Sequence, residues 1–321
     1  MLVLSFTTIA AVASLVRAAT YTVSDTFIGP SFLTGFNHEA ISDPTHGRVN
    51  YVDQATAQSL NLTYASSNTF IMRADSTTVL SPSGPGRNSV RIISKKQWST
   101  HVEIMDVRHM PQGCGTWPAY CNTVDWPSAG EIDIIEGVND QSPNAATLHT
   151  TPGCTQPATG RDQTGTTTGT DCNWQVNGNA GCGVKARQDN SYGPSFNNNG
   201  GGWYAMERTT TYIKVWFWPR GHNYGYGSKS VPAQVRNGAS SIDTSTWGTP
   251  FASFVNTSCD ISSKFGPENI IINLTFCGDW AGNSDVYAAS RCPSTCVDYV
   301  NNNPAAFKGA YWDIAALRVY Q

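Results

Sequence analysis

The chain has 321 residues, of which 40% are hydrophobic and only 13% charged, with 20 Lys and Arg against 23 Asp and Glu for a formal charge of −3. This length and apolar content suit a large folded core, and the near-neutral balance offers no basic surface for nucleic acid or anionic lipid. The composition therefore excludes a disordered chain, a coiled coil and a nucleic-acid-binding protein.

The first 19 residues resemble a secretory signal. Residues 2–16 form the apolar run LVLSFTTIAAVASLV, and small residues follow at the expected cleavage site, Arg17-Ala18-Ala19-Thr20. The alternative is a membrane anchor, but the run is shorter than the roughly 20 residues that a span requires. We therefore expect a signal peptide at 1–19, a single domain at 20–321, and a protein secreted to the extracellular space or cell wall without membrane attachment.

The rest of the chain favours strands joined by long loops. Alternating or β-branched apolar runs predict strands at 89–94, 101–107, 131–138, 203–219, 269–276 and 311–320. No stretch keeps a sustained helical period with caps at both ends. The fold class predicted from these patterns is all-β, as one β-sandwich.

Residues 150–202 differ from the strand-rich parts. They are rich in Gly, Thr and Asn and contain three cysteines. The alternatives are a linker and a surface loop held by disulfides, and the cysteines favour the loop.

Cysteines and glycosylation signals agree with an oxidising compartment. The nine cysteines lack the paired spacing of a zinc site, and eight of them can form four disulfides in an undetermined pairing. Three sequons, at Asn61, Asn256 and Asn273, are candidate glycan acceptors if they face solvent. Asn273 is the weakest candidate because it lies in an apolar, strand-like run.

The acidic strand carries the strongest chemical signal. Residues 130–140 are GEIDIIEGVND. In an extended strand Glu131 and Asp133 point to one face, whereas Glu136 has the opposite parity unless a β-bulge at Ile134–Ile135 restores it. With that bulge the three acids share a face, although Glu131 and Glu136 start about 13 Å apart along the backbone and must lean together.

Crowded carboxylates repel one another, which favours a catalytic over a structural origin. Retaining glycosidases need one ionised nucleophile and one proton donor, with carboxyl groups roughly 5–5.5 Å apart. The alternative is an acidic, solvent-facing strand that discourages aggregation.

The motif GEIDIIEG resembles the signature of glycoside hydrolase family 16 in its bulged form. Further segments resemble secreted fungal-type endo-β-1,3(4)-glucanases, or laminarinases: PSGPGRNSVR at 82–91, RHMPQGCGTWP at 108–118, LHT at 148–150 and CGDWAG at 277–282. The resemblance covers essentially residues 20–321. It implies a β-jelly-roll of two curved antiparallel sheets with a substrate cleft across the concave face.

The resemblance also implies roles for individual residues. Glu131 is the expected nucleophile, Asp133 the supporting acid and Glu136 the acid/base, with His149 close to the acid/base. Arg91 is expected to bind sugar hydroxyls, and Trp126 and Trp280 to stack on sugar rings. The alternatives are a satisfied structural histidine, a surface arginine and tryptophans packed in the core.

One position departs from the family pattern. Laminarinases of this type carry a second Trp after the CGTWP segment, whereas this chain has Cys121 there and a loop to Trp126 that is about two residues short. The other eight cysteines occupy positions ordinary for the family, so Cys121 is the odd one. We expect the affinity for sugar to be altered, with Tyr120 as the aromatic side chain that compensates for the missing Trp. The alternatives for the Cys121 thiol are a buried and inert group, a disulfide between two copies of the chain, and a mixed disulfide with a small thiol.

Three functions follow from this sequence. The first is retaining, endo-acting hydrolysis of β-1,3-glucans and β-1,3/1,4-glucans. The second is transglycosylation of cell-wall glucan, and the third is glucan binding without turnover. None of them requires a cofactor or a metal, and the expected partner is a β-glucan bound by a monomer.

Overall fold

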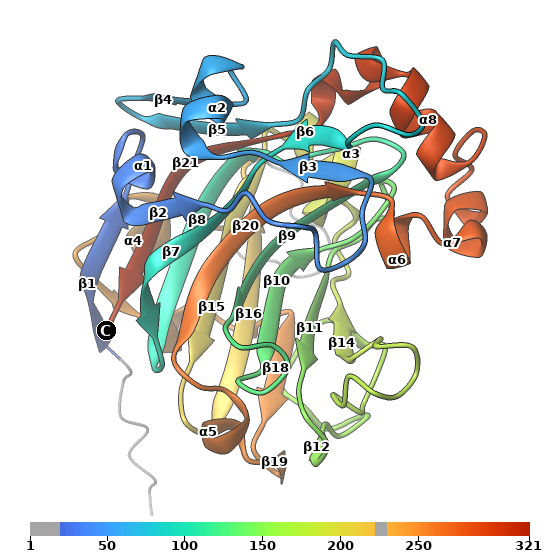
Figure 1. Cartoon of the computed structure of the whole chain (residues 1–321). Coiled ribbons are helices and arrows are strands. Elements are labelled where there is room, and N and C mark those ends of the chain that lie inside the picture. Colours follow the sequence, from blue (N-terminus) through green and yellow to red (C-terminus); the bar gives the residue numbers. More distant parts are fainter. Residues whose placement is uncertain (1–19, 222–229) are drawn as a thin grey trace, which may run out of the picture.

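The computed structural model describes residues 20–221 and 230–321. Two large sheets, made of antiparallel strand pairs, lie face to face and curve in the same sense, with several of the short helices at the upper end in Figure 1. Strand-rich composition and alternating apolar residues produce this arrangement, since each sheet buries one face against the other. The expected all-β sandwich of jelly-roll type is confirmed. The expected signal peptide lies outside the described residues.

One sheet, called the outer sheet here, has nine strands. Seven follow the order β17-β1-β21-β8-β15-β16-β18, while β5 pairs with β21 and β4 with β5. Their bounds are β1 Thr20–Phe27, β4 Thr63–Ser66, β5 Thr69–Arg73, β8 His101–His109, β15 Gly202–Arg208, β16 Tyr212–Pro219, β17 Ser241–Asp243, β18 Ala252–Val255 and β21 Tyr311–Tyr320.

The second sheet, called the cleft sheet, has eight strands in the order β13-β14-β11-β10-β9-β20-β7-β2. Their bounds are β2 Phe36–His38, β7 Arg91–Trp98, β9 Thr116–Thr123, β10 Glu131–Glu136, β11 Ala145–His149, β13 Thr166–Thr167, β14 Cys182–Lys185 and β20 Glu268–Phe276. The acidic strand β10 is therefore an interior strand, flanked by β9 and β11, which excludes the alternative of an exposed sheet edge.

Shorter elements complete the chain. The strands β3 (Val49–Tyr51) and β6 (Arg87–Ser89) form a small parallel pair, and β12 (Cys154–Thr155) pairs with β19 (Ser258–Cys259). The α-helices are α1 Ser31–Gly35, α2 Gln54–Ser59, α3 Gly193–Asn198, α4 Ala233–Arg236, α5 Ile261–Lys264, α6 Gly278–Ala281, α7 Ser284–Ala289 and α8 Cys296–Asn302. Three 3₁₀ helices are η1 Asp189–Ser191, η2 Thr244–Thr246 and η3 Pro304–Gly309. No helix in the described ranges has the length and hydropathy to cross a membrane.

The predicted strands agree with the observed ones except at their ends. The run 203–219 is two strands, β15 and β16, which pair as a hairpin around the polar turn Thr209–Thr211. The run 89–94 falls across β6 and β7. A break between consecutive strands is hard to predict because apolar patterning continues through short turns.

Four disulfides brace the loops. They join Cys114 to Cys292, Cys154 to Cys259, Cys172 to Cys182 and Cys277 to Cys296. Two of them tie down the segment 150–202, which confirms the predicted disulfide-held loop. Cys121 is the free cysteine of the nine, also as expected.

The hydrophobic core lies between the two sheets, with Ile132, Ile134 and Ile135 of β10 among its fully buried members. Their burial fixes the opposite face of β10, and its acids, towards the cleft.

Candidate active site

The predicted bulge in β10 is present. Asp133 lies opposite Cys121 of β9, and Ile135 lies opposite the next residue, Tyr120, so that Ile134 is the extra residue. The register with β11 shifts between the same two acids, Asp133 and Glu136. Because two consecutive isoleucines both point into the core, Glu136 regains the parity of Glu131 and Asp133. The bulge therefore places all three acids on the cleft face.

Glu131 lies partly exposed in the cleft, and the indole of Trp126 is hydrogen-bonded to its carboxylate. Trp126 Nε1 donates a hydrogen bond of 2.8 Å to Glu131 Oε2. Burial raises the pKa of Glu131 to about 7, against the lowering effects of this hydrogen bond and of the Arg91 charge. Both opposing contacts favour the ionised form, which is the form that a nucleophile needs.

Glu136 has a matching partner at the other end of the strand. Trp117 Nε1 donates a 2.8 Å hydrogen bond to Glu136 Oε1, and the Glu136 backbone N–H donates to Asn144 Oδ1 at 3.1 Å. The pKa of Glu136 is raised to about 7, mainly by burial and also by the negative charge of Glu131. The charge of His149 and the hydrogen bond from Trp117 act in the opposite direction and lower this pKa. The pKa values of Glu136 and Glu131 are therefore alike, and two carboxyl groups of this kind share one proton close to neutral pH, which the proton donor supplies.

Asp133 and His149 lie between and beside the glutamates. His149 of β11 is the cross-strand partner of Glu131, and its Nε2 is 3.4 Å from Asp133 Oδ2. The other ring nitrogen, Nδ1, lies 2.9 Å from Asn179 Oδ1. Burial raises the pKa of Asp133 well above its ordinary value, and the charges of Glu136 and Glu131 add to the effect. Asp133 is thus favoured in its protonated form, able to share a hydrogen with a neighbouring carboxylate.

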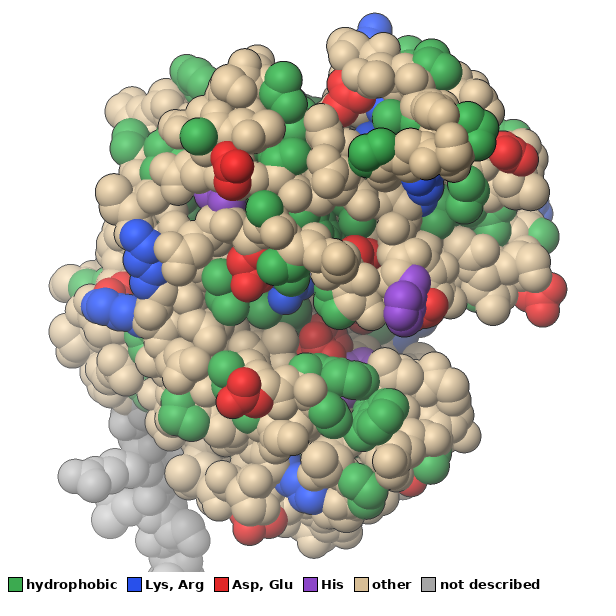
Figure 2. Space-filling view, in the orientation of Figure 1, with side chains coloured by type: hydrophobic (Ala, Val, Ile, Leu, Met, Phe, Trp, Pro, Cys, Tyr) green, Lys and Arg blue, Asp and Glu red, His purple; other side chains and the backbone are tan. Residues whose placement is uncertain are grey.

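Tryptophans line the cleft around these acids. Trp126 is 42% exposed and meets Trp174 edge-on, with ring centroids 5.2 Å apart. Trp280, on α6, meets Trp117 edge-on at 5.6 Å. Space filling shows a hollow across this face, with acidic and histidine side chains in its floor and hydrophobic ones along its edge (Figure 2). Partly exposed indoles beside carboxyl groups are suited to carbohydrate.

Two of these tryptophans were missed by the sequence analysis. Trp117 has the strand parity of Cys121, four residues later, so period-2 alternation along β9 could have placed it on the cleft face. Trp174 lies in the loop 150–202, and no local pattern there gives its position.

Arg91 occupies the cleft face of β7 rather than an open surface. Its Nε donates to Glu39 Oε2 at 2.7 Å, and both side chains are largely buried. The strand β20 places Asn273 between Arg91 and Ala119, where its Nδ2 donates to the Tyr51 hydroxyl at 3.0 Å. This end of the cleft therefore presents amide, hydroxyl and guanidinium groups.

Tyr120 requires a correction. It was expected to reach the sugar site, but its ring is fully buried in the core between the sheets. The reason is strand alternation: because Cys121 points into the cleft, Tyr120 must point away from it. Tyr120 therefore supplies no stacking surface in place of the missing Trp.

The three sequons differ in exposure. Asn61 and Asn256 are exposed, whereas Asn273 is 7% exposed and its amide is engaged with Tyr51. This burial disfavours a glycan on Asn273.

Two glutamates on one face of a cleft are the pair of carboxyl groups that a retaining glycoside hydrolase uses. Residues 36–320 match the family profile described as XgeA-like, catalytic GH16 domain. The chain belongs to glycoside hydrolase family 16.

Relatives of known name agree with this assignment. A probable endo-1,3(4)-beta-glucanase of Neosartorya fischeri is 43% identical over 95% of this chain, which covers 46% of that protein. A probable glycosidase of Schizosaccharomyces pombe is 42% identical over 95% of this chain and 70% of its own length. The chain thus spans about half the length of the first of these relatives.

Solved structures are similar along nearly the whole chain. Laminarinase 16A from Phanerochaete chrysosporium, with 6-O-glucosyl-laminaritriose in donor and acceptor sites, is 63% identical with a TM-score of 0.91, covering 94% of this chain and 100% of its own. An elongating family 16 β-1,3-glucosyltransferase is 41% identical with a TM-score of 0.85, at the same coverages.

Proposed function

We propose that this domain hydrolyses internal β-1,3 bonds of β-glucans, including mixed β-1,3/1,4-glucans, with retention of configuration. The observation that carries the proposal is the bulged strand β10, which brings Glu131 and Glu136 onto one cleft face, each hydrogen-bonded to its own tryptophan. A retaining mechanism needs two such carboxyl groups, one ionised and one protonated.

The residues divide the chemistry as follows. Glu131 attacks the anomeric carbon and forms the glycosyl-enzyme, while Glu136 gives its proton to the departing glycosidic oxygen. Glu136 then takes a proton from water, and the resulting hydroxide oxygen displaces Glu131. Asp133, when protonated, is suited to donate a hydrogen bond to a neighbouring carboxylate during the reaction, and His149 Nε2 lies 3.4 Å from its Oδ2.

Sugar binding falls to the cleft aromatics and to the polar end near Arg91. Trp126, Trp174 and Trp280 offer indole faces to pyranose rings, and Arg91 offers guanidinium N–H groups beyond its bond to Glu39. The ligand named for Laminarinase 16A, 6-O-glucosyl-laminaritriose, supports a β-1,3-glucan as substrate.

Transglycosylation is the second candidate, because a sugar hydroxyl can replace water in attacking the glycosyl-enzyme. A structural relative is described as an elongating β-1,3-glucosyltransferase, and a mutant Laminarinase 16A is described as cyclising laminariheptaose. Glucan binding without turnover is the third candidate, and the presence of Glu131, Asp133 and Glu136 weighs against it.

We also propose that the protein is secreted as a single catalytic domain at 20–321 after removal of a signal at 1–19. Four disulfides support an oxidising compartment. Asn61 and Asn256 are the exposed glycan acceptors, and we expect a monomer.

A time course on laminarin and on mixed-linkage β-glucan, with products sized by mass spectrometry, tests the function. Hydrolysis predicts short oligosaccharides that accumulate with the wild type and disappear with Glu131→Ala. Chains longer than the donor would assign a transglycosylase. Binding without products in both proteins would refute catalysis.

A further inference from the structure

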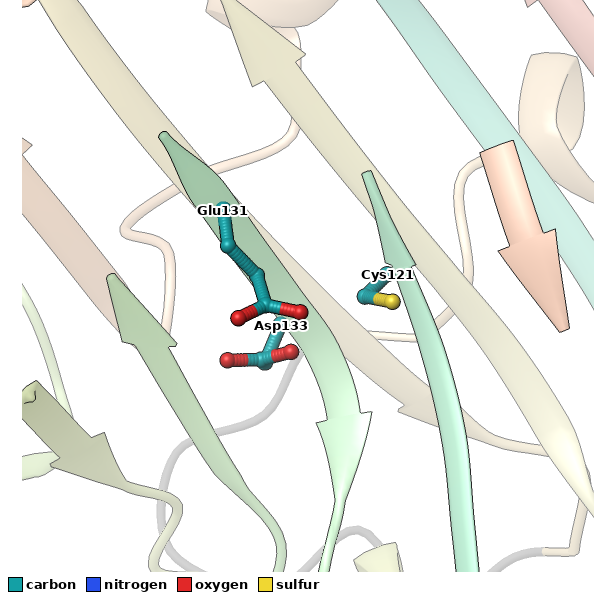
Figure 3. A group of neighbouring side chains, drawn as sticks. All are labelled: Cys121, Glu131 and Asp133. Carbon is teal, nitrogen blue, oxygen red and sulfur yellow. The ribbon is translucent and has the colours of Figure 1, made fainter. Parts of the chain in front are cut away.

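Cys121 lies directly against the catalytic acids. It is the register partner of Asp133 across β9 and β10, and both side chains point to the face that carries Glu131 (Figure 3). The Cys121 sulfur and one carboxylate oxygen from each of Glu131 and Asp133 all lie within 4.8 Å of one another. A soft sulfur and two hard oxygens therefore face one small space.

One of these three groups, Asp133, has a buried oxygen without a hydrogen-bond partner among the described residues. Asp133 is 2% exposed, and its Oδ2 accepts no hydrogen bond, with His149 Nε2 at 3.4 Å. Cys121 is 5% exposed and in no disulfide. Arg91, whose charge acts on Glu131 and Cys121, has its Nε bound to Glu39. Buried polar atoms of this kind normally find a partner, so the space is suited to a cation.

The donor set selects the kind of cation. Magnesium and calcium prefer sites made of oxygen alone, whereas zinc binds cysteine sulfur, at about 2.3 Å, together with carboxylate oxygen, at about 2.0–2.2 Å. A tetrahedral zinc site at those bond lengths separates its ligand atoms by about 3.5 Å. Because the three atoms lie within 4.8 Å of one another, they need to close by at most about 1.3 Å, through rotation of the Glu131, Asp133 and Cys121 side chains.

We propose that Cys121, Glu131 and Asp133 form a zinc-binding site whose occupation blocks the cleft. With three protein ligands, the fourth position stays open to water or to a sugar hydroxyl. Binding releases the protons of the Cys121 thiol and of the Asp133 carboxyl to solvent, and it occupies a Glu131 oxygen, so that this carboxylate is no longer free to attack a sugar. The inhibitory consequence rests on the proposed function, since it uses Glu131 as nucleophile, but the metal site itself does not.

Metal binding is measured first, without turnover. Cadmium is the optical probe because a cadmium–thiolate bond has an ultraviolet charge-transfer band, and zinc is titrated by calorimetry. The wild type should bind one cadmium ion with that band, and zinc should displace it. Absence of the band in the folded wild-type protein would overturn the proposal.

Variants locate the ion. Loss of a residue that is hydrogen-bonded to a metal ligand lowers metal affinity by about 10- to 100-fold. Loss of the ligand itself in Cys121→Ser should therefore lower the affinity by at least about 10-fold and abolish the cadmium band. Asp133→Asn should keep the band with weaker affinity. His46→Ala is the matched control, because the exposed pair His46–Asp279, with Nδ1 2.9 Å from Oδ2, is another imidazole–carboxylate pair at the surface. Zinc affinity that falls in His46→Ala and not in Cys121→Ser would refute the site.

Inhibition is the second measurement. Zinc should raise the apparent KM of the wild type for laminarin. For each protein, the rate with zinc is divided by the rate of the same protein without zinc. This ratio should not depend on zinc concentration in Cys121→Ser. An inactive wild type that binds cadmium through Cys121 would refute the proposed function and keep the metal site. An active wild type whose rate is indifferent to zinc at saturating site occupancy would overturn the inhibitory claim.

Discussion

Removing each of the two tryptophan–glutamate hydrogen bonds shows which glutamate controls which limb of the pH–rate profile. In Trp117→Phe the aromatic ring remains but the N–H donated to Glu136 Oε1 is lost. That bond favours the ionised carboxylate and holds the pKa of Glu136 down, so its removal raises the pKa above about 7. Glu136 then stays protonated to higher pH, and the alkaline limb of kcat/KM should move to higher pH.

The size of this displacement follows from the bond. A hydrogen bond to a charged group contributes about 1.5–3 kcal/mol, and one pKa unit corresponds to about 1.4 kcal/mol, which sets a range of about one to two units. Because Glu136 is partly open to the cleft, we expect the lower value, about one unit. In Trp126→Phe the acidic limb should move upward instead, by less, since Trp126 is 42% exposed and solvent screens its bond to Glu131.

The assay is kcat/KM on laminarin across the pH range for the wild type and both variants, because this ratio reports the groups of the free enzyme. Altered sugar affinity changes the height of each profile but not the position of its limbs. A larger shift of the acidic limb than of the alkaline limb in Trp117→Phe would refute Glu136 as the proton donor, as would a downward shift.

Other variants test the chemistry, the cleft and the stability of the domain. Glu136→Gln should lower kcat on laminarin by about 10²- to 10⁴-fold through loss of general acid catalysis, and a loss below 10-fold would contradict its role. Cys121→Trp should restore a stacking surface on the cleft face and lower KM on laminarin, whereas unchanged KM and product sizes would contradict the importance of that position. Replacing Cys114 and Cys292 by Ala opens a loop of 178 residues, shortened to about 73 by the Cys154–Cys259 bridge within it, and should cost about 4 kcal/mol of stability, against about 3 kcal/mol for Cys172 and Cys182, which are 10 apart. Denaturant unfolding checks this, and an equal loss in both double variants would contradict the chain-entropy argument.

Local patterning was enough to predict the strand that carries the acids. The alternation in GEIDIIEG places Glu131 and Asp133 on one face, and the adjacent isoleucines demand a bulge because both must be buried. The same rule, applied one strand earlier, would have excluded Tyr120 from the cleft and included Trp117.

Contacts between distant segments were beyond sequence reasoning. The pairing of Arg91 with Glu39, the bond from Asn273 to Tyr51 and the position of Trp174 beside Trp126 depend on loop paths and on the order of strands in the sheet. Strand order was not predicted, since apolar patterning specifies which face of a strand is buried and not which strand lies next to it. Disulfide pairing was likewise left open by the cysteine spacing.

The stereochemistry of the first product tests the central claim most directly. Proton NMR of laminarin hydrolysis, recorded before mutarotation, resolves the anomer released by the enzyme. Two displacements, by Glu131 and then by water activated at Glu136, predict the β-anomer first, with the α-anomer appearing only later. Initial release of the α-anomer would contradict the account, because it would require a single displacement at a site that lacks a covalent intermediate.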